Sequence, residues 1–553
     1  MTGSGKIRKF DIDLTSFLLS LIVLCVLSVV LTLQYGSNIL FYAGFPFLFL
    51  AASITGSHIG LEAFVADQFS KRLSRKKYAD AVAVLFACLK SMLLLAGGLF
   101  VLAWCGSHLM NNHLTAAVAR LFLPAILLMP FIGILKGLLR SIGHMAVSRI
   151  LTWVMSAGFL LSGLVFGILG YYKGEKVGAL LRNNNMRYVY SACGIAAGFD
   201  ITVGAILVIL SLISFASVRR IQRSYRYRQD DLFPTDGNEN KAQLFRYCLQ
   251  RMAMALVLPD FPMIAIFIGS RLWLSSGRVK TNTLASMWGG FAGIGLPVCL
   301  GLGIAAAMPF TFLAMQTVRS SQQGKIRAMK LRLSMLLRLS AYVGIPMTAF
   351  VFAAAKELVG LFPELTFRAE ESAILSLKSG SFLIFLVQTM VLLLIFFWNC
   401  KGRRVIFVSA CASFFACIVT QVLLMVFGVG ITMNMWPLDV MAAVFIVFLF
   451  LGGQELLRGL RNDFLMDDLR ILLCAGLSAI PLILLNDYLI LIMPAAAASA
   501  AMLVVYWILY VILSILLRAA DLDNIQRVPM GGWIFELGLL LGAAGNEEDD
   551  EEE

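Results

Sequence analysis

The chain alternates from end to end between long apolar runs and short polar segments. Each run has about 20 or more residues, enough for a helix to cross a hydrocarbon core about 30 Å thick. None shows the two-residue alternation of a barrel strand, and only a helix satisfies its own backbone within lipid. The pattern predicts an all-α polytopic membrane bundle of about fourteen transmembrane helices. The predicted spans are Leu14–Leu33, Ile39–Phe64, Ala81–Cys105, Val118–Leu138, Ala146–Leu169, Tyr190–Phe215, Met252–Leu274, Leu284–Leu313, Leu333–Phe352, Leu375–Trp398, Val405–Val429, Trp436–Leu457, Leu469–Leu489 and Ile492–Leu517.

Basic residues gather in the loops that follow the even-numbered spans, for example in Lys71–Lys77 and Arg319–Arg332. The loop Gly106–Thr115, on the opposite side, has no Lys or Arg. Two segments on that side, Tyr171–Arg187 and Arg271–Lys280, do contain basic residues and are exceptions. Because Lys and Arg concentrate on the cytoplasmic side, the pattern predicts a multi-pass protein of the cell membrane with both termini in the cytoplasm.

The composition agrees with a membrane protein, because 60% of the 553 residues are hydrophobic and only 14% are charged. Soluble chains carry roughly 25% charged residues. The net charge of +13 would suggest nucleic-acid binding in a soluble protein. Here the basic residues border apolar spans, so topology and anionic headgroups explain them and no nucleic-acid partner is expected. The cysteines form no CxxC pair or Cys/His cluster, so no metal or other cofactor is expected.

A polar segment, Gln229–Lys241, separates two halves of the chain. The predicted domains are an N-terminal lobe 1–228 with spans one to six, a linker 229–246, a C-terminal lobe 247–457 with spans seven to twelve, a helix pair 458–520, and an end region 521–553. Within the end region, Asn524–Leu541 is predicted to lie at the cytoplasmic membrane surface, and the acidic tail Asn546–Glu553 is predicted to be disordered.

The two halves show a weak repeat. A basic loop follows both the second and the eighth span, and the turn Arg140–His144 resembles Asn399–Arg403 six spans later. Repeats with the same orientation usually pack about an axis along the membrane normal, with the substrate between them. We therefore expect two pseudo-symmetric six-helix lobes plus the C-terminal helix pair.

Four stretches resemble a known superfamily in their order and spacing. They are GLEAFVADQFSKRLSRKKYA at 60–79, LPDFPMIAIFIGSRLWLSSG at 258–277, WGGFAGIGLPVCLGLGIAAAMPFTFLAMQTVRSSQQG at 288–324 and DLDNIQRVPMGGWIFELGLLL at 521–541. The chain resembles the multidrug/oligosaccharidyl-lipid/polysaccharide flippase superfamily, and within it the stage V sporulation protein B-like polysaccharide transporters. The resemblance implies a flippase that moves a lipid-linked sugar, a peptidoglycan or polysaccharide precursor on a polyprenyl diphosphate, across the cytoplasmic membrane by alternating access.

The chain departs from this superfamily at two charged positions. Family members often carry an Arg in helix one, which has none here, and an Asp in helix seven at the position of Ile264. Asp260 lies one helical turn earlier on the same face and is expected to replace that Asp. The missing Arg leaves an inactive scaffold of an envelope-synthesis complex as an alternative.

Charged residues within the spans are the candidate site residues, because a charge at membrane depth costs about 2.5–3.5 kcal/mol. The substrate-binding candidates are Lys90, Arg120, Arg271 and Lys378, and the acidic candidates for coupling or for lining the cavity are Asp200, Asp260 and Glu62. Structural alternatives stand beside each. Arg120, Arg271 and Lys378 would extend to headgroups, Glu62 would pair with Lys71 or Arg72, and Lys90, Asp200 and Asp260 would form buried ion pairs.

Three other functional classes are weighed against the flippase. A cation-coupled multidrug exporter of the same superfamily usually has twelve helices, so the extra pair favours the flippase. A membrane enzyme would need a substantial external loop for its carboxylates, and none much exceeds Tyr171–Arg187, so no enzyme activity is expected. A scaffold would bind envelope-synthesis proteins.

The driving energy for transport would come from a proton, a monovalent cation or the membrane potential. No P-loop pattern occurs.

Overall fold

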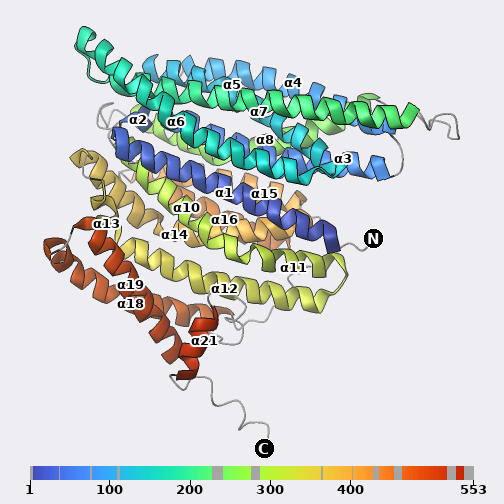
Figure 1. The fold of residues 1–553 in the computed structure, drawn as a ribbon. Coiled ribbons are helices and arrows are strands. Elements are labelled where there is room, and N and C mark those ends of the chain that lie inside the picture. Colours follow the sequence, from blue (N-terminus) through green and yellow to red (C-terminus); the bar gives the residue numbers. More distant parts are fainter. Residues whose placement is uncertain are drawn as a thin grey trace, which may run out of the picture. The chain divides into compact units, whose positions relative to one another are not determined.

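In the computed structural model, every described element is a helix (Figure 1). The structure describes residues 4–36, 38–74, 78–108, 113–226, 241–275, 287–362, 365–400, 403–427, 435–453, 464–492, 494–519 and 531–540. The helices are α1 (Ser4–Tyr35), α2 (Ile39–Thr55), η1 (Gly56–Glu62), α3 (Ala63–Ser74), α4 (Tyr78–His108), α5 (His113–Ile142), α6 (Met145–Leu181), α7 (Met186–Arg226), α8 (Lys241–Ser275), η2 (Phe291–Gly295), α10 (Leu296–Ala307), η3 (Met308–Phe310), α11 (Thr311–Gln322), α12 (Ile326–Ala353), α13 (Ala355–Gly360), α14 (Phe367–Asn399), α15 (Arg403–Val426), α16 (Trp436–Gly452), α18 (Phe464–Ile492), α19 (Ala495–Leu516) and α21 (Gly531–Leu540).

The helices confirm the predicted fold class. Eleven described helices are long and apolar enough to cross a membrane, and two shorter apolar helices, Trp436–Gly452 and Leu469–Leu484, add to them. Together with α8, they correspond one to one with the predicted spans. The chain is therefore an all-α, multi-pass membrane protein. The predicted linker and acidic tail lie outside the described residues, except for the linker's end from Lys241 on, where α8 begins.

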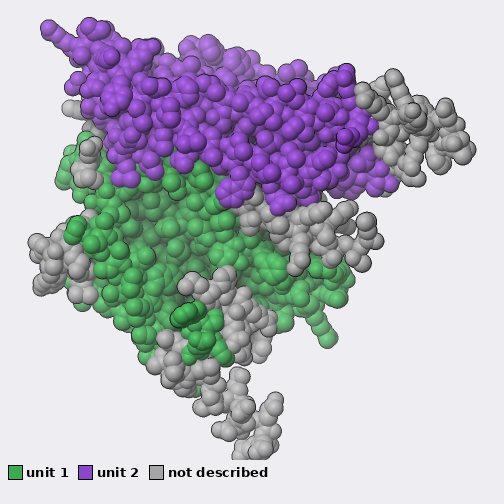
Figure 2. All heavy atoms as spheres, viewed as in Figure 1, with its two compact units in different colours: residues 1–29, 268–553 green, residues 30–267 purple. Residues whose placement is uncertain are grey.

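The chain forms two compact units (Figure 2). Unit 1 contains residues 1–29 and 268–553, and unit 2 contains residues 30–267. The boundary passes through α1 and α8, whereas the predicted lobes meet in the linker. The pseudo-symmetry of the lobes stays a prediction.

The loop predicted between spans five and six is mostly helix, and this expectation was wrong. Helix α6 continues to Leu181 and α7 begins at Met186 (Figure 1). Glycines explain the extension, because the two backbones touch along the hairpin. A Cβ on Gly174 would lie 2.6 Å from the carbonyl oxygen of Met186, and one on Gly198 would lie 2.8 Å from that of Ser162. Lys173, Lys176 and Arg187 therefore belong to a paired helical extension, and only Arg182 lies in the turn between the two helices.

Polar side chains compensate for prolines inside the spans. A proline removes the helical partner of the carbonyl four residues earlier. The Ser53 hydroxyl donates to the carbonyl oxygen of Ile126 at 2.8 Å, the oxygen that Pro130 leaves without its helical donor. In unit 1 the buried Tyr510 hydroxyl donates at 2.9 Å to the carbonyl of Tyr342, four residues before Pro346. Such replacement bonds make proline kinks tolerable in lipid.

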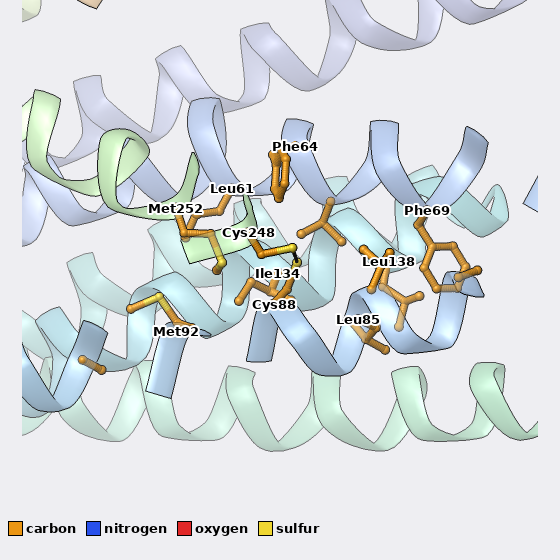
Figure 3. Packing of buried hydrophobic residues seen from close by; sticks show 14 residues of the cluster. Leu61, Phe64, Phe69, Leu85, Cys88, Met92, Ile134, Leu138, Cys248 and Met252 are labelled. Carbon is orange, nitrogen blue, oxygen red and sulfur yellow. Dashed lines mark hydrogen bonds between the residues drawn. The ribbon is translucent and has the colours of Figure 1, made fainter. Parts of the chain in front are cut away.

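An apolar cluster joins α3, α4, α5 and α8 within unit 2 (Figure 3). Leu61, Phe64 and Cys248 are among its buried members. The sulfur atoms of Cys88 and Cys248 lie 3.8 Å apart in its middle. This packing holds one face of the η1–α3 segment. His58 and Glu62 of η1 instead contact charged side chains.

Candidate functional site

A buried cluster of charged side chains lies in unit 2, where η1 meets α5 and α6. Glu62 is 4% exposed, Lys136 3% and His58 8%. The Oε2 atom of Glu62 lies 3.4 Å from Lys136 Nζ and 3.1 Å from His58 Nδ1, and its Oε1 atom lies 3.7 Å from Arg140. Because desolvating a charge is expensive, such a group persists only when its charges are paired and hydrogen-bonded. We name these four residues the buried charge cluster.

Local backbone structure brings the cluster together. The second span is a π-helix over Gly56–Glu62, a form that is rare and often found at functional sites. It packs against Gly133 and Gly137 of α5. A Cβ on Gly133 would lie 2.6 Å from the carbonyl oxygen of Ser57, and one on Gly137 would lie 2.7 Å from that of Glu62. Only glycine permits this approach, which places Lys136 beside Glu62.

Helix α6 supplies hydroxyl partners to the cluster. Lys136 Nζ donates to Thr152 Oγ1 at 2.5 Å, and Ser148 donates to Glu62 Oε1 at 3.4 Å. Lys136 Nζ also lies 3.0 Å from His58 Nδ1. The same ring nitrogen is therefore within hydrogen-bond distance of a carboxylate and of an ammonium group.

Glu62 pairs with Lys136 and Arg140 of α5, whereas the structural alternative from the sequence paired it with Lys71 or Arg72. The residue that does pair with Lys71 is Asp67, at 2.7 Å, with side chains 40% and 61% exposed for Asp67 and Lys71. Glu62 instead turns into the bundle toward α5. The i,i+4 spacing of Asp67 and Lys71 is visible in the sequence, whereas the pairing of Glu62 and Lys136 depends on tertiary contact.

Asp200 of α7 accepts a hydrogen bond from the backbone of α5 next to a proline. Its Oδ1 atom accepts a hydrogen bond of 2.7 Å from the backbone N–H of Ala125, which directly follows Pro124 in α5. The structure gives Asp200 this backbone partner in place of the ion pair that was its structural alternative.

Two predicted lysines lie on exposed faces. Lys90 is exposed on α4 together with Phe86, 54% exposed, and Leu93, 68% exposed. Lys378 is exposed on α14, where Phe382, one turn later, is 49% exposed. Neither ammonium group is buried inside its own unit. The buried ion pair that was the alternative for Lys90 is therefore wrong.

Arg120 ties two helices of unit 2 together. Its guanidinium carbon lies 4.6 Å from the centre of the Trp104 ring, and its Nε atom donates to Ser107 Oγ at 2.9 Å.

The two remaining candidates lie on α8. Asp260 is half-buried there. Arg271 belongs to the last turns of α8, and its side chain lies outside the described residues.

Sequence reasoning selected Glu62 and missed its partners. It did not select His58 or Lys136, although both lie inside predicted spans, and it placed Arg140 in the turn Arg140–His144. The available signal was a pair of i,i+4 spacings, His58 to Glu62 and Lys136 to Arg140, which places each pair on one helix face. Within the described part of the chain, no group of three or more His, Cys, Asp or Glu side chains is arranged to hold a metal ion.

No family model and no curated protein matches the chain. Solved structures do match, and they show that the chain has the fold of known multi-pass membrane transporters. The lipid II flippase MurJ in its inward closed conformation is 12% identical, with a TM-score of 0.53, over 92% of this chain and 98% of that one. An inward-facing multidrug resistance MATE family transporter is 13% identical, with a TM-score of 0.52, over 80% of this chain and 94% of that one. A second MATE structure, of a single-residue mutant, is 12% identical, with a TM-score of 0.50, over 81% of this chain and 95% of that one. The predicted superfamily resemblance is thus confirmed for the fold.

Proposed function

We propose that the protein is a flippase that carries a lipid-linked sugar on a polyprenyl diphosphate across the cell membrane by alternating access. The observation that carries the proposal is an exposed lysine deep within a span. Lys90 lies nine residues, about 14 Å, inside the predicted span Ala81–Cys105, close to the middle of a core about 30 Å thick. Lys378 is also exposed and lies three residues, about 5 Å, inside the predicted span Leu375–Trp398, near one end of that span.

An exposed ammonium group at the depth of Lys90 is costly against lipid tails. The cost falls if the exposed face borders water, so we infer that each lysine borders water at the surface of its own unit. A diphosphate group crossing the membrane needs such cations to offset its charge. The apolar residues beside Lys90 and Lys378 would accompany the polyprenyl tail.

The extent of the structural likeness also supports a flippase. The MurJ structure corresponds to 92% of this chain, and the MATE structures to 80% and 81%. The C-terminal pair α18 and α19 packs within unit 1, since Tyr342 of α12 and Ser514 of α19 share a hydrogen bond of 2.8 Å. A multidrug exporter is the second candidate, but the mid-depth ammonium group of Lys90 would repel a cationic drug.

Reconstitution into lipid vesicles tests the proposal. The probe is a fluorescent undecaprenyl-diphosphate sugar, and its transfer between leaflets is followed with a membrane-impermeant quencher. We expect the wild type to equilibrate the probe, and Lys90→Ala and Lys378→Ala each to slow it at least tenfold. The matched control Lys71→Ala removes an exposed lysine whose charge is already paired with Asp67, and this variant should transfer the probe at the wild-type rate.

Each negative result of the vesicle assay would lead to a different conclusion. A wild type that leaves the probe in its original leaflet but releases a trapped cationic dye would favour the exporter. A wild type that moves neither compound would favour the inactive scaffold. A wild type that moves the probe while both lysine variants keep full activity would remove the lysines from the substrate path.

A further inference from the structure

The buried charge cluster contains hydrogen-bond contacts that cannot all be satisfied together. His58 Nδ1 lies 3.1 Å from Glu62 Oε2 and 3.0 Å from Lys136 Nζ. A ring nitrogen either carries a hydrogen and donates or presents a lone pair and accepts. With a hydrogen on Nδ1, the ring can donate to the carboxylate of Glu62 but cannot accept from the ammonium of Lys136. With a lone pair on Nδ1, the ring can accept from Lys136 but cannot donate to Glu62.

We propose that His58, Glu62 and Lys136 form a proton-binding centre in which a proton on His58 selects Glu62 and releases Lys136. When Nδ1 has no proton, it accepts from Lys136. When the ring is doubly protonated, Nδ1 donates to Glu62, and the two cations 3.0 Å apart repel each other. Lys136 then keeps its bond to Thr152 and loses the one to the ring. The proton thereby decides whether α5 is joined to η1 through the imidazole.

The surroundings of the centre favour such a switch. The charged groups near His58 include Glu62 on η1 itself and Lys136 and Arg140 on α5, and α6 contributes the hydroxyls of Ser148 and Thr152. All three residues of the centre are buried, so each charge acts on its neighbours with little screening by water. His58 and Glu62 also lie on a π-helix between two α-helical segments, a form that is rare overall and frequent at functional sites.

The binding of the proton does not depend on the proposed function, but a role in driving transport does. Protonation that removes the imidazole contact between η1 and α5, while the direct pairs of Glu62 with Lys136 and Arg140 remain, would bias one of two packings of unit 2, which is how a bound ion couples to a conformational change. A proton gradient would then be the energy source for the flippase cycle.

The test is nuclear magnetic resonance of the full-length protein in lipid nanodiscs, labelled with 15N-histidine or 15N-lysine and titrated from pH 4.5 to 9. The spectrum of His58→Gln identifies the His58 signals. We expect His58 to change from one neutral form to the doubly protonated form, and the Nζ signal of Lys136 to change with the same midpoint. The variant serves only to assign the signals, and the titration itself is recorded on the wild type.

Two substitutions then test the charges. Glu62→Gln removes the anion that favours the protonated ring, so the midpoint should fall by about one pH unit or more, and Lys136→Met should raise it by a similar amount. Lys71→Met, which removes an exposed lysine, should leave the midpoint unchanged. The proposal is overturned if His58 keeps one protonation state across the range, or if Lys136 does not follow it. Because no transport is measured, this result is separate from the vesicle assay.

Discussion

Replacing Lys136 with methionine removes the ammonium group that lies 3.4 Å from Glu62 and keeps a side chain of similar length. The carboxylate of Glu62 then stays buried, with His58 and Arg140 still beside it. Breaking a buried ion pair on one side costs about 3–5 kcal/mol. We expect about 3 kcal/mol here, the lower end of that range, because Arg140 at 3.7 Å still offsets part of the charge.

A double-mutant cycle with Glu62→Gln isolates the pairing from other effects of the substitutions. The double variant has no unpaired carboxylate, so its loss of stability should be smaller than the two single losses together. We expect a coupling free energy of about 2–3 kcal/mol, near the upper end for residues in contact.

The exposed pair Asp67–Lys71 is the matched control. Its atoms are closer, at 2.7 Å, but both side chains are well exposed. Exposed i,i+4 pairs contribute about 0.3–0.5 kcal/mol. The control cycle with Asp67→Asn and Lys71→Met should therefore show a several-fold smaller coupling, although its distance is shorter.

The measurement is reversible unfolding in mixed detergent micelles, followed by tryptophan fluorescence and by circular dichroism. Additive losses in the Glu62–Lys136 cycle, or an equal coupling in the two cycles, would refute the reasoning. In that case burial would not be what makes the cluster important for stability.

Three further predictions follow from single contacts. Gly137→Ala should destabilise unit 2 by about 1–3 kcal/mol in the same unfolding assay, because its methyl group would meet the carbonyl of Glu62. Gly97→Ala is the matched control, because open space surrounds Gly97. Asp200→Ala should cost about 1.5–3 kcal/mol by removing the carboxylate that accepts from Ala125, and Asp200→Asn, which keeps an acceptor oxygen, should cost less; equal losses would contradict this role. Tyr510→Phe should cost about 1 kcal/mol by removing the donor to the Tyr342 carbonyl, and less in a Pro346→Ala background, where the restored backbone N–H can serve that carbonyl; an unchanged cost would show that the hydroxyl acts elsewhere.

Much of the architecture was predictable because a membrane imposes simple rules on sequence. A span must be apolar over its full length, and this requirement set the helix count and approximate positions. The end of α6 was not predictable in the same way. Lys173 and Lys176 indicated a loop by polarity, whereas the helix continues because Gly170 and Gly174 allow close contact with α7.

The candidate site was predictable only in part. The energetic cost of a charge in a span singled out Glu62 and Lys90, because that cost depends on residue type and depth alone. Which partner each charge finds depends on helices that are distant in sequence. Asp200 therefore turned out to accept from Ala125 of α5, 75 residues away, rather than to join an ion pair.

The sequence by itself determined that this chain is an all-helical, multi-pass membrane protein, since hydrophobicity, segment length and charge placement are local properties. The tertiary structure alone decided that His58 and Glu62 of η1 meet Lys136 and Arg140 of α5. That meeting needs a π-helical turn and two glycines on a facing helix, and short-range pattern does not encode such a contact.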